Sequence, residues 1–233
     1  MTTSFPGYRD YPTTPVTPLQ RGAVNEVLQS IGQAPVSTLD SSNPDVAIAW
    51  NTLVSSSRDI QAEGWTFNRE YHIQMARDSN NKLLVPANYI QIDLTNDPAN
   101  LNHDAVIRTD ATGQRFLYDR FQHSDNWYYN PYVDVILKFD WEDVPTPIAN
   151  YIIARAAAIT SSRITGDTTQ YKMLQERESF CRAQALEYET SQGDYNFLGI
   201  DRSDNVYQPF SPCLLYTSPS PRDLSTSRMP SSA

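Results

Sequence analysis

The chain contains 233 residues and carries a formal net charge of −9 at pH 7, without any local run of Lys and Arg. A protein of this length can bury one good core, or one core and a smaller satellite. The lack of clustered positive charge argues against a surface that follows nucleic-acid phosphates. Hydrophobic residues make up 39% and tyrosine occurs 14 times, which favours a folded protein that keeps aromatic side chains for contact with partners.

The first predicted elements are an extended arm and a helix. Residues 1–17 are rich in proline and show no hydrophobic periodicity, which predicts an extended N-terminal arm. Thr17 has the pattern of an N-cap, with Pro18 and Gln20 at the first and third helical positions, so a helix is expected to begin at Pro18. Gly32 ends it. Its apolar stripe is formed by residues spaced every four positions: Leu19, Ala23, Val27 and Ile31.

A second helix is expected after the turn around Asn43 and Pro44, ending at Gly64. Its apolar positions face one way: Val46, Ala49, Trp50, Leu53 and Ile60. Residues 18–64 are therefore predicted to form a pair of antiparallel helices.

The hydrophobic period changes to two in the middle of the chain, which predicts an antiparallel β insert over residues 65–145. About five or six strands are expected there. They cover residues 72–75, 82–85, 89–94, 105–108, 115–119 and 133–139. Asn80-Asn81 and the segment 110–113 have the composition of hairpin turns.

Two further helices are predicted over residues 146–193. Thr146 is the expected cap of a helix over 147–165, and Asp167 the expected cap of a helix that runs to about Gln192. The predicted fold is therefore α+β, with the N-terminal and C-terminal helix pairs closing a four-helix bundle from which an antiparallel β lobe projects.

The end of the chain divides into a C-terminal extension, residues 194–212, and a tail of different composition, residues 213–233. The run from Cys213 to Asp223 matches the translation of a transposase-type short-read sequencing adaptor, and Ser227 to Ala233 matches the distal end of that adaptor in the same frame. We therefore interpret 213–233 as non-native and exclude it from fold reasoning. Removing its two Arg and one Asp changes the net charge from −9 to −10.

Catalytic and membrane motifs are not found in the sequence. There is no glycine-rich phosphate loop, CxxC, HExxH or GxSxG pattern, and neither a signal peptide nor an apolar segment of membrane-spanning length is expected. The remaining candidates fit ordinary structural roles, so no enzyme activity, metal or cofactor is predicted. They are three histidines (His72, His103 and His123), an acidic group (Asp134, Asp140, Glu142 and Asp143), and Cys181, which is expected to be a buried thiol.

An aromatic segment over residues 126–132 supplies the candidate site. Four side chains, Trp127, Tyr128, Tyr129 and Tyr132, are candidates for a protein interface, since Trp and Tyr dominate binding hot spots. Two alternatives stay open: the segment folds back onto its own sheet, or it stacks a sugar. If it is an interface, replacing all four residues by Ala is expected to leave the fold intact and block assembly.

Two motifs in order resemble a known family. The stretch GAVNEVLQSIGQAPVSTL, residues 22–39, and the stretch SSSRDIQAEGWTFNRE, residues 55–70, resemble the tail tubular protein A family of T7-like podoviruses. The resemblance covers about residues 19–193 and extends to the Ala-Arg-Ala-Ala segment at 154–157. Gly64, Trp65 and Phe67 belong to the second motif. Gly64 is expected to end the second helix, and the side chains of Trp65 and Phe67 are expected to pack back on the helical bundle.

The resemblance implies a structural virion protein, a head-to-tail adaptor assembled in the host cytoplasm. Such subunits form a dodecameric ring between the portal protein and the tail nozzle (tail tubular protein B-like), with tail fibres as a further contact. DNA passes through the lumen without specific binding, which an acidic surface would favour. The alternative functions are a carbohydrate-binding module on the β insert and a hydrolytic tail module acting on envelope sugars.

Overall fold

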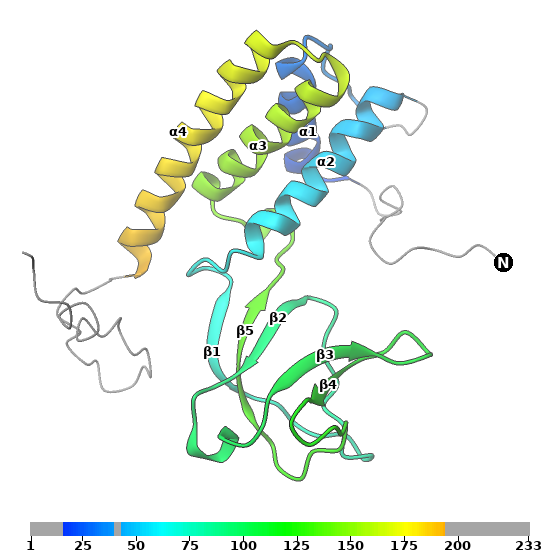
Figure 1. Cartoon of the computed structure of the whole chain (residues 1–233). Coiled ribbons are helices and arrows are strands. Elements are labelled where there is room, and N and C mark those ends of the chain that lie inside the picture. Colours follow the sequence, from blue (N-terminus) through cyan, green and yellow to red (C-terminus); the bar gives the residue numbers. More distant parts are fainter. Residues whose placement is uncertain (1–15, 40–42, 194–233) are drawn as a thin grey trace, which may run out of the picture. The chain divides into compact units, whose positions relative to one another are not determined.

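The computed structural model describes residues 16–39 and 43–193, and its elements are mixed helix and antiparallel strand (Figure 1). This confirms the α+β class. Most of the predicted arm, the extension 194–212 and the tail 213–233 lie outside the described residues. The helices are α1 (Pro18–Ser30), α2 (Pro44–Gln61), α3 (Thr146–Ile164) and α4 (Thr168–Gly193). The strands are β1 (Arg69–Gln74), β2 (Tyr89–Leu94), β3 (Ala105–Thr109), β4 (Arg115–Asp119) and β5 (Tyr132–Leu137), and two short 3₁₀ turns are η1 (Pro98–Asn100) and η2 (Trp141–Asp143).

Side-chain caps fix the starts of α1, α2 and α4. The Thr17 hydroxyl accepts from the backbone N–H of Gln20, and the Gln20 side chain accepts from the Thr17 N–H, both at 3.3 Å, which confirms the predicted capping box. Asp167 accepts from the N–H of Thr169 at 2.8 Å, as expected for α4. The predicted cap at Thr146 is wrong: Thr146 is already helical, and the N-cap is Pro145, which has no side chain able to accept a bond.

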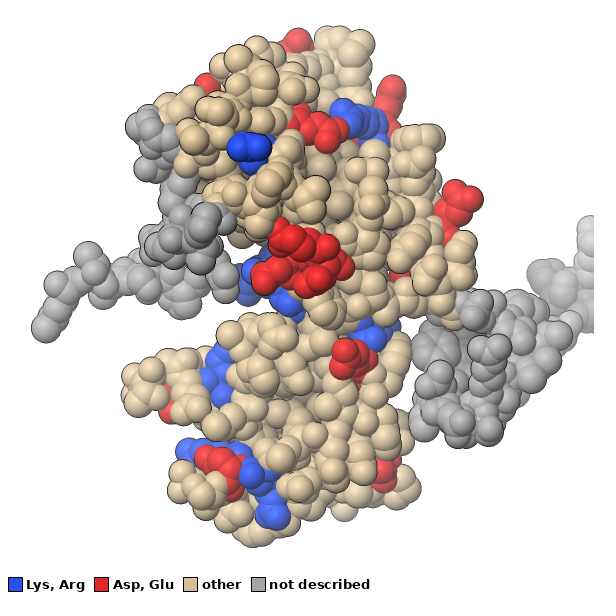
Figure 2. Space-filling model, turned by 180° about the vertical axis from the view of Figure 1, so that it is seen from behind, with Lys and Arg blue, Asp and Glu red and all other residues tan. Residues whose placement is uncertain are grey.

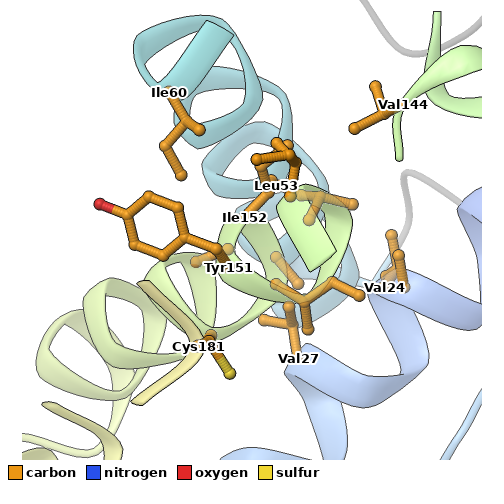
Figure 3. Packing of buried hydrophobic residues seen from close by; sticks show 14 of the residues in the cluster. Val24, Val27, Leu53, Ile60, Val144, Tyr151, Ile152 and Cys181 are labelled. Atoms are coloured by element: carbon orange, nitrogen blue, oxygen red, sulfur yellow. The ribbon is translucent and has the colours of Figure 1, made fainter. Parts of the chain in front are cut away.

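The helices enclose the larger of two hydrophobic clusters. Side chains from α1, α2 and α3 point toward one another, and Cys181 reaches them from α4 (Figure 3). Cys181 and Ala185 are the buried residues of α4, so the expectation of a buried thiol is confirmed. Leu19, expected in the apolar stripe of α1, is 61% exposed, and the buried residues of this helix are Ala23, Val24, Val27 and Leu28. The closed four-helix bundle stays a prediction.

The β lobe, residues 69–137, contains two small sheets and the second hydrophobic cluster. One sheet has the order β1-β5-β2 and the other pairs β3 with β4, all antiparallel. The predicted strand at 82–85 is not formed. Leu84 makes only an isolated bridge to Phe116, although the neighbouring backbone bonds Val85 N to Arg115 O and Leu117 N to Leu83 O hold the segment against β4.

The chain passes between the helices and the β lobe twice, and two fully buried amides join the passages. The Asn68 side chain donates to the carbonyl oxygens of Gln61 and Leu137 at 2.8 and 2.9 Å. The Gln61 side chain exchanges two hydrogen bonds with the backbone of Phe139. Trp65 lies in the helical cluster and donates from its indole N–H to the Ile60 carbonyl at 2.7 Å, so the residues after Gly64 fold back onto the helices as expected.

Candidate interface at the distal end of the β lobe

The candidate aromatic segment lies at the end of the β lobe away from the helices. β1 begins and β5 ends where the chain passes to the helices, so the antiparallel pairing of Gln74 with Tyr132 marks the distal end. β2 also ends there, at Leu94, and leads into η1. The segment 126–131, the turn after β4 and the residues around η1 therefore meet at one place.

The four predicted aromatic residues have different environments. Trp127 is 2% exposed and donates from its indole N–H to the Leu117 carbonyl at 2.9 Å. Tyr129 is partly buried and donates to the Asn100 side chain at 2.8 Å. Tyr132 stacks on the His72 ring, with centroids 4.1 Å apart. Tyr128, in contrast, is 87% exposed.

The exposure of these four residues distinguishes those that stabilise the fold from the one that can contact a partner. Trp127 belongs to the second hydrophobic cluster, so the expectation that the fold tolerates all four Ala substitutions conflicts with its burial. Tyr128 is the candidate that presents its ring to solvent. Burial, together with the nearby carboxylates of Asp119 and Asp97, raises the pKa of Tyr129, whose hydroxyl donates to Asn100.

A buried carboxylate organises the surrounding loops. Asp119 is 2% exposed, and it bonds to the Nδ1 atom of His103 through one oxygen. Its other oxygen accepts the backbone N–H groups of Asp104, Phe121 and Gln122 at 3.3, 2.9 and 3.2 Å. Burial alone would raise the pKa of Asp119, but the bonds from His103 and from the backbone outweigh it, so this pKa lies below its ordinary value.

Further contacts tie the same loops together. The Arg120 guanidinium bonds to the Asp104 carboxylate at 2.5 Å, and the His103 ring lies 5.2 Å from the Tyr129 ring between centroids. Since Tyr129 is bonded to Asn100, the residues after η1, the turn after β4 and the aromatic segment form one connected unit. This arrangement was not apparent from the sequence, where His103 and Asp119 lie in separate segments.

Three large apolar side chains project from this connected unit. Leu101 is 73% exposed, Phe121 is 68% exposed, and Tyr128 is the third. Each one adjoins a residue held by the bonds above: Leu101 follows Asn100, Phe121 donates its N–H to Asp119, and Tyr128 lies between Trp127 and Tyr129. We call these three residues the tip surface. Exposed apolar groups on a fixed backbone are typical of a contact surface for another protein.

The other sequence candidates do not converge on a chemical site. Asp134 accepts from the His72 N–H at 3.0 Å and from the Thr95 hydroxyl at 2.8 Å, which are structural bonds within one sheet. Asp140, Glu142 and Asp143 are exposed around η2, and His123 is exposed in the turn after β4. Among residues 16–39 and 43–193, no group of three His, Cys, Asp or Glu side chains is placed to hold a metal ion.

Two general features of the described residues concern the apolar character of the helices and the distribution of basic side chains. No helix in the described part of the chain has both the length and the apolar character to cross a bilayer. On the face drawn in Figure 2, Lys and Arg side chains are scattered among acidic ones and do not merge into one basic surface.

The family model described as tail tubular protein matches residues 22–195. The chain belongs to the tail tubular protein family. It is therefore a structural component of a bacteriophage tail, and the sequence resemblance is confirmed at this level. No curated protein matches the chain. Within this family the tip surface is a candidate for contact with a neighbouring tail subunit or another virion protein.

Proposed function

We propose that this tail tubular protein is a head-to-tail adaptor without enzyme activity, and that its tip surface contacts the next protein of the tail. The observation that carries the contact proposal is the exposure of Leu101, Phe121 and Tyr128 on loops fixed by Asp119. A surface held in one conformation before binding loses little entropy when it docks. Once water is excluded from the contact, aromatic and apolar side chains supply most of the binding energy.

The proposed assembly is a ring of copies, dodecameric as in the family resemblance, that docks on the portal and carries the tail nozzle and fibres. In this proposal residues 18–64 and 146–193 form a four-helix bundle, residues 65–145 form the inserted lobe, and residues 1–17 and 194–212 reach neighbouring subunits. DNA passes through the lumen without specific binding. The charges beside the tip surface are paired with one another, Asp104 with Arg120 and Lys82 with Asp125, which favours a protein partner over a polyanion.

Electron microscopy of the purified chain tests the adaptor role. The chain is mixed with the portal and nozzle proteins encoded on the same DNA, and rings on the portal that recruit the nozzle are the expected result. A folded chain that binds neither protein would refute the role.

The tip surface is tested by a triple variant, Leu101→Ser, Phe121→Ser and Tyr128→Ala, which is expected to keep its circular dichroism spectrum and lose one of the joints. The matched control is Leu186→Ser, an exposed apolar residue of α4 at 46% exposure, which is expected to assemble normally. Normal assembly by the triple variant would show that the tip surface is not the joint.

A further inference from the structure

A polar hollow lies between α1 and α4. It has a volume of about 480 Å³ and is lined by Gly22, Glu26, Gln29, Ser30 and Arg177. Space is free beside Gly22, since a Cβ atom added there would meet no neighbouring atom within 4 Å. A glycine in the middle of a helix lowers helix stability by about 0.5–1 kcal/mol relative to alanine.

The two helices that line this hollow also carry exposed apolar side chains. Glu26 pairs with Arg177, and the Gln170 side chain donates to the Ser30 carbonyl at 2.6 Å, so α1 and α4 run antiparallel. This register places Gly22 level with the turn of α4 that contains Phe180.

Phe180 is 62% exposed and Met173, two turns away on the same side of α4, is 66% exposed. Leu19, one turn before Gly22 on α1, is exposed as well. We call the hollow with these three side chains the α1–α4 groove. It combines apolar groups with one ion pair, which suits a peptide that carries both.

The first fifteen residues of the chain have a matching pattern. Their aromatic residues recur at every third position, Phe5, Tyr8 and Tyr11, among prolines at positions 6, 12 and 15. A polyproline II segment has three residues per turn, so these three rings would lie on one side of it. From the first ring to the last the segment would span about 19 Å at 3.1 Å per residue, close to the roughly 20 Å length of a helix of 13 residues such as α1.

Charge is complementary too. Arg9 and Asp10 stand between the second and third rings and match the Glu26–Arg177 pair, whose side chains are 40% and 51% exposed. A docked segment would exchange one ion pair for two, so no charge would be left unpaired in the groove. Proline-rich segments bind to other proteins through a similar combination, because their extended conformation is formed before they dock on exposed apolar side chains.

The direction of the chain before α1 decides which groove is occupied. Thr17 is extended, with φ −71° and ψ 156°, as expected for a residue that precedes a proline. A return onto its own α1 would need the chain to reverse its direction just before this extended residue. We infer that residues 1–15 of one copy bind the α1–α4 groove of a neighbouring copy. This inference rests on the self-assembly proposed above.

Isotope-resolved cross-linking tests the inference on the full chain. Tyr8→p-benzoylphenylalanine is introduced into both unlabelled and ¹⁵N-labelled protein, and the two are mixed in equal amounts, dissociated, reassembled and irradiated. The expected result is light–heavy cross-links from position 8 to peptides of α1 and α4. Cross-links confined to chains of one label, or to other parts of the protein, would overturn the inference.

Two sets of variants of the cross-linkable chain sharpen this test. Gly22→Phe fills the groove on a helix that has room for the side chain, and a loss of cross-link of roughly tenfold or more is expected. Gln175→Phe, on an exposed position of α4 outside the groove, is the matched control. Phe5→Ser with Tyr11→Ser weakens the segment itself without touching the helices, and Thr3→Ala with Thr13→Ala is its control. Retention of the cross-link by either test variant would contradict the inference.

Sedimentation of the same samples separates the inference from the proposed function. If the copies assemble but position 8 is cross-linked outside the α1–α4 groove, the proposed adaptor role is unaffected and binding of residues 1–15 in the groove is refuted. Copies that do not associate at any concentration, alone or with the portal protein, would refute both.

Discussion

Gly64 gives the sharpest test of the packing at the passage from α2 to the β lobe. Its φ is +75°, and a Cβ atom there would lie 2.6 Å from Arg69 Nη2 and 2.7 Å from Ile136 Cδ1. The left-handed backbone costs an alanine about 1–2 kcal/mol. The Arg69 guanidinium can move away, but Ile136 is 6% exposed, so displacing it adds about 1–3 kcal/mol. Gly64→Ala is therefore expected to destabilise the protein by about 2–5 kcal/mol.

The matched comparison is Gly32→Ala. Gly32 has a similar φ of +81°, but its Cβ would meet no atom within 4 Å, so only the backbone cost of about 1–2 kcal/mol is expected. Urea denaturation followed by tryptophan fluorescence measures both changes in one protein. The difference between the variants isolates the contact with Ile136. Equal loss of stability in the two variants would refute the claim that close packing adds to the backbone requirement at Gly64.

Three further predictions follow from buried groups. Trp127→Ala should lower the free energy of unfolding by about 3–5 kcal/mol in urea denaturation, whereas Tyr128→Ala should change it by less than about 0.5 kcal/mol; similar effects would contradict their assigned environments. Gln61→Met keeps the volume of the side chain but leaves the backbone groups of Phe139 without partners, so the free energy of unfolding is expected to fall by about 1–3 kcal/mol in the same assay. An unchanged free energy of unfolding would show that water replaces the amide. Because the folded-state pKa of Asp119 is lowered, its stabilisation should be full above the unfolded pKa near 3.9 and be lost as pH falls toward the folded value. Asp119→Asn should flatten this acid-side decline in thermal denaturation, and an unchanged decline would assign it to other carboxylates.

The elements were largely predictable because their signals are local. The capping box at Thr17, the alternation over 89–94 and the aspartate cap at position 167 each lie within a few residues, and each was found where expected. The strand expected at 82–85 failed for a non-local reason. Leu83 and Val85 are buried, while Leu84 is 39% exposed and makes only an isolated bridge to β4. The residue pattern alone does not distinguish a bridged segment from a full strand.

The candidate site was less predictable, since its organisation depends on contacts between distant segments. Aromatic composition identified the segment around Tyr128, but it gave no indication that Trp127 is buried while its neighbour is exposed. The decisive contact, His103 with Asp119, joins residues whose proximity follows from β3 pairing with β4. Leu101 and Phe121 stand alone in polar surroundings in the sequence, and only the fold shows that their loops are bonded into one unit.

The two amide-bonded passages also determine how readily the β lobe can be exchanged. Leu137 donates its N–H to the Asn68 carbonyl at 2.8 Å, so the polypeptide leaves the lobe beside the point where it enters. The residues between Asn68 and Leu137 are therefore an insertion in the helical part, and the two ends of this insertion are adjacent. Insertions are tolerated best where such ends already meet. We therefore expect that related tail proteins can carry lobes of different size or binding preference on a constant helical base, as long as the amides at Gln61 and Asn68 are kept.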